Sequence, residues 1–147
     1  MTAPAPSSRD SLRQLHRTLV AGLVAFWIVI GVFTYAGVVP LTRDAPFPPS
    51  VMVAICGAVL LVAVLWARPR VPARSASTGI DDYFRDERVR AGVNFVIFLL
   101  DGSATLVAVW TLLTGSWMTA VVSLVSIVIM AFNGPERFER SVDGLEP

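Results

Sequence analysis

The sequence predicts an all-α integral membrane protein, a bundle of four membrane-spanning helices with both termini in the cytoplasm. Hydrophobic residues make up 54% of the 147-residue chain and charged residues only 16%, which is too little charge to cover a soluble domain of this size. The apolar residues gather in four blocks separated by short polar stretches. The arginines lie in the polar stretches between and beside these blocks. If the number of spans is even, those arginine-rich stretches fall on one side of the membrane.

The N-terminal region is predicted as a disordered, basic tail over residues 1–18, because it holds Pro4, Pro6 and small polar residues without an apolar period. The first span is predicted at residues 19–39, ending before Pro40. A helix of that length, rising about 1.5 Å per residue, crosses a hydrocarbon core about 30 Å thick. A cleaved signal peptide is the alternative, but the apolar run is long for one, so an uncleaved span is favoured.

The second span is predicted at residues 50–67. Four prolines precede it and make a stiff loop, and Pro48 or Pro49 is suited to begin the helix. The span is short for a hydrocarbon core. It therefore needs aromatic anchors such as Trp66 at its edges, or a locally thinned bilayer.

The longest polar stretch is predicted to carry a short amphipathic helix over residues 79–91, lying on the cytoplasmic membrane surface. Thr78 stands three residues before Asp81, as in a capping box with Asp in place of Glu. Two acid-first pairs at i,i+4 spacing favour the helix: Asp81–Arg85 and Asp86–Arg90. Three apolar residues share one face: Ile80, Tyr83 and Phe84. A helix that binds a partner protein is the alternative interpretation.

The last two spans are predicted at residues 93–113 and 117–132 as a helical hairpin. The turn at residues 114–116 is too short to join anything but antiparallel neighbours. An Asn-Gly-Pro sequence then stops the helix. Residues 133–147 are predicted as a cytoplasmic tail, with one further turn through Phe138.

The basic residues orient the chain. All 12 are arginine, as a GC-rich genome would produce. The expected location is the inner (cytoplasmic) membrane of a bacterium. Arg43 alone falls in a loop predicted to face away from the cytoplasm. The others flank the spans on the cytoplasmic side: Arg9, Arg13, Arg17, Arg68, Arg70, Arg74, Arg85, Arg88, Arg90, Arg137 and Arg140.

Asp101 is the one ionisable residue deep inside a predicted span. On a lipid-facing surface it would cost about 2.5–3.5 kcal/mol, so we expect it to face the bundle or a partner protein. A candidate intramembrane polar site follows from helical spacing: Asp101, Asn94, Thr105, Ser123 and Ser126. Two roles are open for Asp101. It binds a proton or cation, or it hydrogen-bonds a neighbouring helix and locks the hairpin.

Several cytoplasmic arginines are candidate contacts for anionic lipid headgroups, because a guanidinium binds phosphate bidentately. They are Arg68, Arg70, Arg74, Arg85 and Arg88. The favoured alternative is that they only orient the protein in the membrane.

The single His and single Cys limit the chemistry that is open to this chain. One Cys excludes a disulfide within the chain, and one His excludes a haem held by two of its own His ligands. We expect His16 to anchor the chain at the membrane edge rather than to ligate a pigment or haem of another chain. Cys56 is expected to be a small buried hydrophobe. No catalytic residue, metal or cofactor is predicted.

The sequence favours a non-catalytic accessory, structural or assembly subunit of a larger membrane complex, of an energy-transducing kind such as a respiratory or photosynthetic one. The expected partners are membrane lipids and other membrane subunits, and a net charge of +1 does not suggest nucleic acid. The alternative is a small proton- or cation-coupled transporter or channel subunit that uses Asp101. A membrane enzyme acting on lipid is disfavoured, because no cluster of acids or His lies near a span end.

Overall fold

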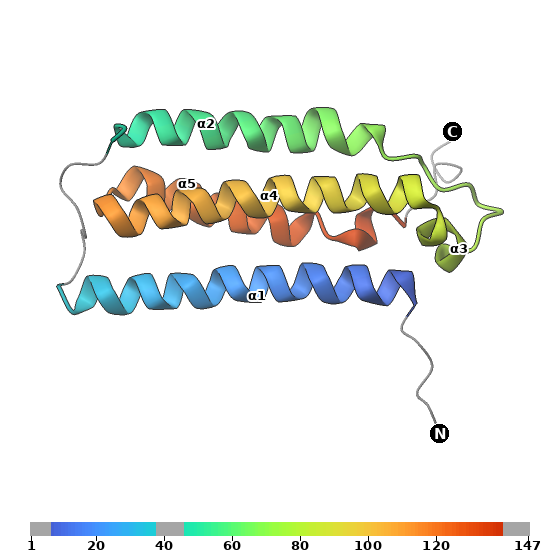
Figure 1. Ribbon diagram of the computed structural model, residues 1–147, viewed down its shortest axis with the longest axis horizontal. Helices are drawn as coiled ribbons and strands as arrows, with labels where there is room; N and C mark the ends of the chain where they lie inside the picture. The colour runs from blue at the N-terminus through green and yellow to red at the C-terminus, as the bar shows by residue number, and fades with distance from the viewer. Residues whose placement is uncertain (1–6, 38–45, 140–147) are drawn as a thin grey trace, which may run out of the picture.

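The computed structural model describes residues 7–37 and 46–139, and those parts of the chain are helical without a β-strand. Four helices lie side by side along the long axis of the molecule (Figure 1). They are α1 (Ser8–Tyr35), α2 (Pro49–Leu61), α4 (Glu87–Thr114) and α5 (Trp117–Phe132). The short helix α3 (Ile80–Arg85) lies at the end where α1 begins.

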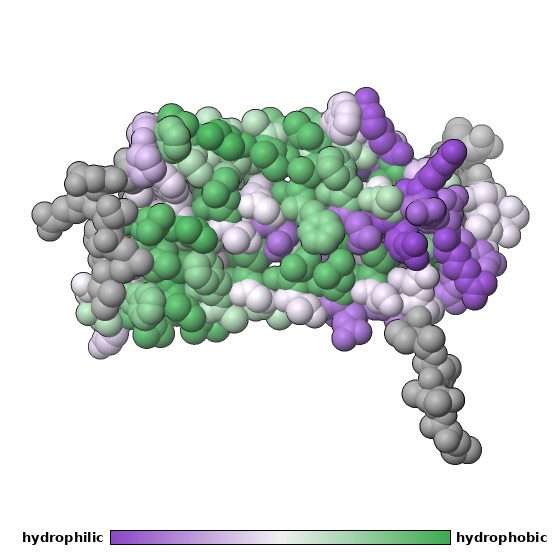
Figure 2. Space-filling model, in the orientation of Figure 1, coloured by the Kyte–Doolittle hydropathy of each residue, from purple (hydrophilic) through white to green (hydrophobic). Residues whose placement is uncertain are grey.

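Three helical segments are long and apolar enough to cross a membrane: Ser8–Tyr35, Pro49–Arg70 and Glu87–Thr114. This finding supports a membrane protein. The predicted fourth span coincides with α5, which is apolar but has only 16 residues. Figure 2 shows a broad hydrophobic surface over the length of the helices and hydrophilic residues gathered at one end, which we call the polar end.

Helix α1 begins at Ser8, well before the predicted start at residue 19, so residues 8–18 are helical rather than disordered. Ser7 caps the helix, since its side chain accepts a hydrogen bond from the backbone N–H of Asp10 at 3.2 Å. Asp10 itself places an acid in the first turn, where the helix dipole favours it. The rest of the predicted tail, residues 1–6, lies outside the described residues.

Helix α2 starts at Pro49, as the sequence predicts, and continues without interruption through a π-helical turn (η1, Val62–Ala67) and a 3₁₀ turn (η2, Arg68–Arg70). The whole segment has 22 residues, or roughly 33 Å at about 1.5 Å per residue. The helix therefore ends three residues later than the predicted end at residue 67, and at this length it no longer requires edge anchors or a thinned bilayer. Sequence reasoning stopped the helix too early because it took the first arginine as the end of the span.

The predicted single helix over residues 79–91 is instead two elements, α3 and the start of α4. Asp86 separates them with an extended backbone (φ −60°, ψ 123°) and caps α4 by accepting a hydrogen bond from the N–H of Arg88 at 2.8 Å. The predicted capping box at Thr78 is also not formed, because Gly79 is the N-cap of α3 and makes no side-chain cap bond. The ion pair found on α3 joins Arg85 to Asp82 at 3.3 Å.

The apolar face of α3 is covered by the protein itself. Phe84 is fully buried and Tyr83 nearly so, and α3 packs against α1 and α4. These two rings lie edge to face, with centroids 5.1 Å apart. The apolar side chains that suggested a helix lying on the membrane therefore close the polar end of the bundle.

Helices α4 and α5 form the predicted hairpin, and they pack against each other more extensively than any other pair of described elements. Gly115 ends α4 in the left-handed conformation (φ 64°), and its N–H bonds to the carbonyl of Thr111 at 2.8 Å. At the far end of α5, Asn133 is the C-cap, and Pro135 begins the 3₁₀ turn η3 (Pro135–Arg137). The predicted helix stop and the further turn up to Phe138 are both confirmed.

Helix α4 is the centre of the structure and α1 is the least embedded helix. Half of the apolar window of α4 is buried inside the molecule, against only 11% for α1. The core lies along α4, with Val93, Ile97 and Leu100 fully buried. Helix α1 contacts α3, α4 and α5, and open space remains beside it along α4.

Gly115 is the position in the hairpin turn where a side chain is strained whatever space is available. A Gly115→Ala substitution is expected to destabilise the fold by about 1–2 kcal/mol, because an L-residue is disfavoured at positive φ. Thermal unfolding of the detergent-solubilised protein measures the effect. Gly57→Ala is the matched control, since it lies within α2 and no atom comes within 4 Å of its added Cβ. Equal melting temperatures for the two variants would contradict this account of the turn.

Candidate functional site

The most unusual polar group in the structure is Asp101, which lies at the middle of α4. It lines an open cavity of about 320 Å³ between α1 and α4, which we call the α1–α4 groove. Figure 2 shows hydrophilic atoms interrupting the hydrophobic surface between these two helices. Eight residues line the groove: Thr18, Leu19, Gly22, Leu23 and Phe26 from α1, and Asp101, Thr105 and Val109 from α4.

The carboxyl of Asp101 is half-buried and has no hydrogen-bond or ion-pair partner within residues 7–37 and 46–139. The groove beside it is open on one side. Thr105 is exposed there, and no atom lies within 4 Å of a Cβ added to Gly22. Asp101 therefore reaches a surface at the mid-length of an apolar helix, where only another group entering the groove can bond to it.

The structure divides the predicted intramembrane polar residues among separate places. Asp101 and Thr105 share the groove, whereas Ser123 and Ser126 are fully buried on α5 and do not line it. Ser126 donates a hydrogen bond to the carbonyl of Val122 in its own helix at 2.7 Å. The buried Oδ1 of Asn94 has no hydrogen-bond partner among the described residues.

Ser123 joins three helices. Its hydroxyl accepts a hydrogen bond from the indole Nε1 of Trp27 on α1 at 2.9 Å, and it donates to the carbonyl of Ala104 on α4 at 3.3 Å. Trp27 was not singled out from the sequence. The missed signal is that an indole N–H deep in an apolar span requires an acceptor.

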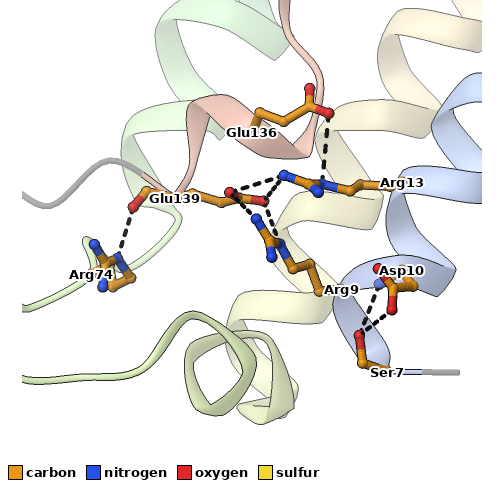
Figure 3. Close-up of polar contacts among 7 residues, drawn as sticks. All are labelled: Ser7, Arg9, Asp10, Arg13, Arg74, Glu136 and Glu139. Atoms are coloured by element: carbon orange, nitrogen blue, oxygen red, sulfur yellow. Dashed lines mark hydrogen bonds and ion pairs between the residues drawn. The ribbon is translucent and has the colours of Figure 1, made fainter.

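The polar end is held together by a carboxylate that the sequence did not single out. Glu139 accepts two hydrogen bonds from Arg9, at 3.1 and 2.9 Å, and two from Arg13, at 2.9 and 3.1 Å (Figure 3). Its backbone carbonyl accepts a further bond from Arg74 at 2.7 Å. Glu136 lies 3.6 Å from Arg13 and is more exposed. This arrangement, which we call the Glu139 clamp, ties the start of α1 to the segment that follows α5.

The sequence predicts His16 as an anchor at the membrane edge, but the structure does not place it at the outer edge of the protein. It is buried, and its ring Nε2 lies 2.9 Å from the carbonyl of Met130 at the end of α5. Gly134 allows this approach, because an added Cβ would come within 3.0 Å of the imidazole. Cys56 is fully buried, as predicted. Within the described residues no three His, Cys, Asp or Glu side chains are grouped to hold a metal ion.

Four of the five arginines that are candidate lipid contacts also have partners within the protein. Arg68 donates to the Oδ1 of Asn133 at 3.1 Å, and Arg70 stacks on Trp66 with its Cζ 4.0 Å from the ring centroid. Arg74 belongs to the Glu139 clamp and Arg85 pairs with Asp82, whereas Arg88 is exposed. The role of these residues in lipid binding stays a prediction.

Comparison of the chain with protein-family models, with curated proteins and with solved structures finds no match.

The Glu139 clamp is expected to stabilise the fold. Glu139→Gln removes the charge that two guanidiniums share, and we expect a loss of about 1–3 kcal/mol, which shows as a lower melting temperature in detergent. The effect should shrink at high salt, since the arginines are partly exposed. Glu136→Gln is the matched control and should change little, because this carboxylate is half-exposed and more distant. The account of the clamp is contradicted if the two variants melt alike.

Proposed function

We propose that this chain is a non-catalytic subunit of a larger membrane complex, and that it joins another membrane protein through the α1–α4 groove. One observation carries the proposal. A carboxyl group at the middle of an apolar helix faces an open groove and has no partner within the described residues. Lipid cannot hydrogen-bond that group, so a partner that supplies a donor stabilises both the acid and the assembly.

The small residues around Asp101 support this proposal. Gly22 and Thr105 face the groove, and residues of this size let a further helix approach the backbone closely. The occupant we propose is a transmembrane helix of a different protein, with a Lys, Arg or other donor side chain at mid-depth. Charge complementarity favours this over a second copy, which would bring another acid to the site.

We further propose that the chain spans the membrane four times and that its polar end lies in the cytoplasm. The start of α1 and the end of α5 lie at the same end of the molecule, beside α3 (Figure 1). Ten arginines of the described residues belong to the segments that meet there, and the positive-inside rule assigns such an end to the cytoplasm. With its arginine-only basic residues, the chain is proposed to reside in a bacterial inner membrane.

The orientation is tested with topology reporters. A reporter active only in the cytoplasm, fused after Pro147, should be active, and the same reporter inserted at position 43 should be silent. A reporter active only outside the cytoplasm should give the reverse pattern. An active extracytoplasmic reporter at the C-terminus would contradict the proposed orientation.

The subunit role is tested by purification from native membranes in mild detergent, followed by quantitative mass spectrometry. The wild-type chain should recover one other membrane protein in constant ratio, and Asp101→Leu should lower that recovery by about tenfold, the equivalent of losing roughly 1.4 kcal/mol. Ser126→Ala is the matched control, since Ser126 is a polar residue of a span outside the groove. Recovery of a homo-oligomer alone would contradict the subunit role.

Asp101→Asn separates assembly from proton coupling. Asparagine keeps hydrogen bonding but cannot titrate, so we expect the complex to be recovered at least in part. If the complex has a transport activity that disappears in this variant while assembly persists, the alternative of a proton-coupled subunit is favoured instead.

A further inference from the structure

A cavity of about 330 Å³ lies between α1 and the end of α5, near the polar end of the molecule. We call it the α1–α5 pocket. Three of its lining residues are charged or titratable, and three are apolar or small: His16, Arg17 and Glu136, and Val20, Ala21 and Ala131. The pocket shares no lining residue with the α1–α4 groove, so it occupies a different face of α1.

His16 presents a ring nitrogen without a partner to this pocket. Its Nε2–H donates to the carbonyl of Met130 at 2.9 Å, because a carbonyl can only accept. The Nδ1 of the neutral ring is then an acceptor, and it has no partner within residues 7–37 and 46–139. The residue is only 7% exposed, so the fold holds this acceptor in place. A ligand that donates a hydrogen bond satisfies it.

The carboxylate of Glu136 approaches the same point. A Cβ placed on Gly134 would lie 3.3 Å from the Nδ1 of His16 and 3.0 Å from the Oε2 of Glu136, so both atoms border the space in front of Gly134. The other oxygen, Oε1, lies 3.6 Å from the Nε of Arg13, which is too far for a hydrogen bond (Figure 3). Two acceptors that lack a close donor among the described residues therefore meet on one side of the pocket.

Arg17 brings the opposite charge into the same cavity. Its side chain is exposed and makes no ion pair with a described residue. Arg17 and Glu136 thus line one pocket without pairing with each other. A ligand that carries a cationic donor and an anion on adjacent groups complements both charges at once.

We propose that the α1–α5 pocket binds the headgroup of a phosphatidylethanolamine lipid, with its ammonium on Glu136 and His16 and its phosphate on Arg17. A primary ammonium has three N–H donors on one compact group, which suits two neighbouring acceptors. A guanidinium binds phosphate because its planar N–H fork matches the oxygens. Phosphatidylglycerol lacks the cation and phosphatidylcholine lacks the N–H donors, so neither satisfies the whole pocket.

The surface that continues from the pocket accommodates acyl chains. Val24 and Ile28 follow Val20 at successive i+4 positions, so they continue its face of α1 away from the polar end. Leu124 and Val128 do the same on α5, at i−7 and i−3 from the pocket residue of that helix. All four side chains are between 46% and 64% exposed. A free phosphoethanolamine compound has no apolar chain to cover them, so this surface favours the lipid.

The neighbouring hollow, which shares Arg17, also contains both signs of charge, but there they are engaged. Asp10 accepts a hydrogen bond from the hydroxyl of Ser7 at 2.9 Å, and Arg13 is bound to Glu139. All of its lining residues come from α1, so it is a furrow on one helix rather than a space between two. The unpaired state of the charges, rather than their presence, therefore selects the α1–α5 pocket.

Native mass spectrometry of the full chain in detergent tests the proposal by counting bound phosphatidylethanolamine, phosphatidylcholine and phosphatidylglycerol in competition. The wild type should prefer phosphatidylethanolamine over phosphatidylcholine by about tenfold. Glu136→Gln should reduce that preference to about twofold, because it removes the charge that receives the ammonium. Glu87→Gln is the matched control and should keep the preference, since it removes the same charge from an exposed position outside the pocket.

Arg17→Gln is a second variant with a different expected result. It should weaken phosphatidylethanolamine and phosphatidylcholine alike, by about fivefold, because both lipids carry the phosphate. Arg90→Gln is its control, since Arg90 is exposed and outside the pocket. Thermal unfolding with added phosphatidylethanolamine or with O-phosphoethanolamine separates the lipid from a free headgroup. Glu136→Gln should melt like the wild type without lipid and gain less stability when the lipid is added.

Loss of the preference in Glu136→Gln but not in Glu87→Gln supports the pocket. A wild type that binds phosphatidylcholine or phosphatidylglycerol as well as phosphatidylethanolamine, or equal loss in both variants, overturns the proposal. Stabilisation by O-phosphoethanolamine equal to that by the lipid overturns the assignment to a lipid. None of these results depends on Asp101 or its partner, so they leave the subunit role untouched.

Discussion

Polar groups carried into a membrane have to be satisfied within the protein, because lipid offers no hydrogen bonds in exchange. The helices of this chain meet the requirement locally in most places. Thr111, Thr114 and Ser126 each donate to a carbonyl one turn earlier in the same helix. Trp27 and Ser123 satisfy each other across helices. Among the described residues of α4, four groups do not follow this rule: the carboxyl of Asp101, the Oδ1 of Asn94, the Oγ of Ser103 and the Nε1 of Trp110. Asp101 is the ionisable one, and the functional interpretation depends on it.

The groove beside Asp101 results from how α1 is attached. The helix is held at the polar end by the Glu139 clamp (Figure 3) and further along by the bond from Trp27 to Ser123. Between these two attachments His16 bonds to the carbonyl of Met130 and Leu23 is buried, but most of the apolar surface of α1 stays uncovered. Because α1 is held along its inner face, the groove beside it is preformed, which lowers the conformational cost of receiving another helix.

The two polar features have separate physical roles. At the polar end, the charges of the Glu139 clamp are engaged with one another, and they fix the relative position of the helix ends. Asp101, at mid-depth, has no such partner among the described residues and lines the open groove, so it is the group that another helix can reach.

Hydropathy and helix punctuation predicted the elements well, because the cost of exposing backbone to lipid constrains them locally. The proline start of α2, the hairpin turn at Gly115 and the stop after Phe132 follow from residues adjacent in sequence. An arginine at the edge of a span predicted the end of a helix less well. Arg13 and Arg68 belong to helical segments because distant partners, Glu139 and Asn133, receive them.

The site was harder to predict because it depends on which helices become neighbours. Helical spacing placed Asp101 and Thr105 on one face of α4, and both line the groove. The same reasoning joined Asp101 to Ser123 and Ser126, since α5 is its nearest neighbour in sequence. The structure instead turns Asp101 toward α1 and Ser123 toward Ala104 and Trp27. The clamp at Glu139 was missed for the same reason, because its partners lie 126 and 130 residues away.

Site-specific photocrosslinking in native membranes tests the central claim most directly. A photoreactive residue at Thr105, exposed in the groove, should crosslink to one other membrane protein, and the crosslink should disappear when Asp101 is replaced by Leu. The same residue at Val125, exposed on α5 outside the groove, should not form that crosslink. Crosslinks only to lipid from Thr105, or the same protein crosslinked from both positions regardless of Asp101, would contradict the account.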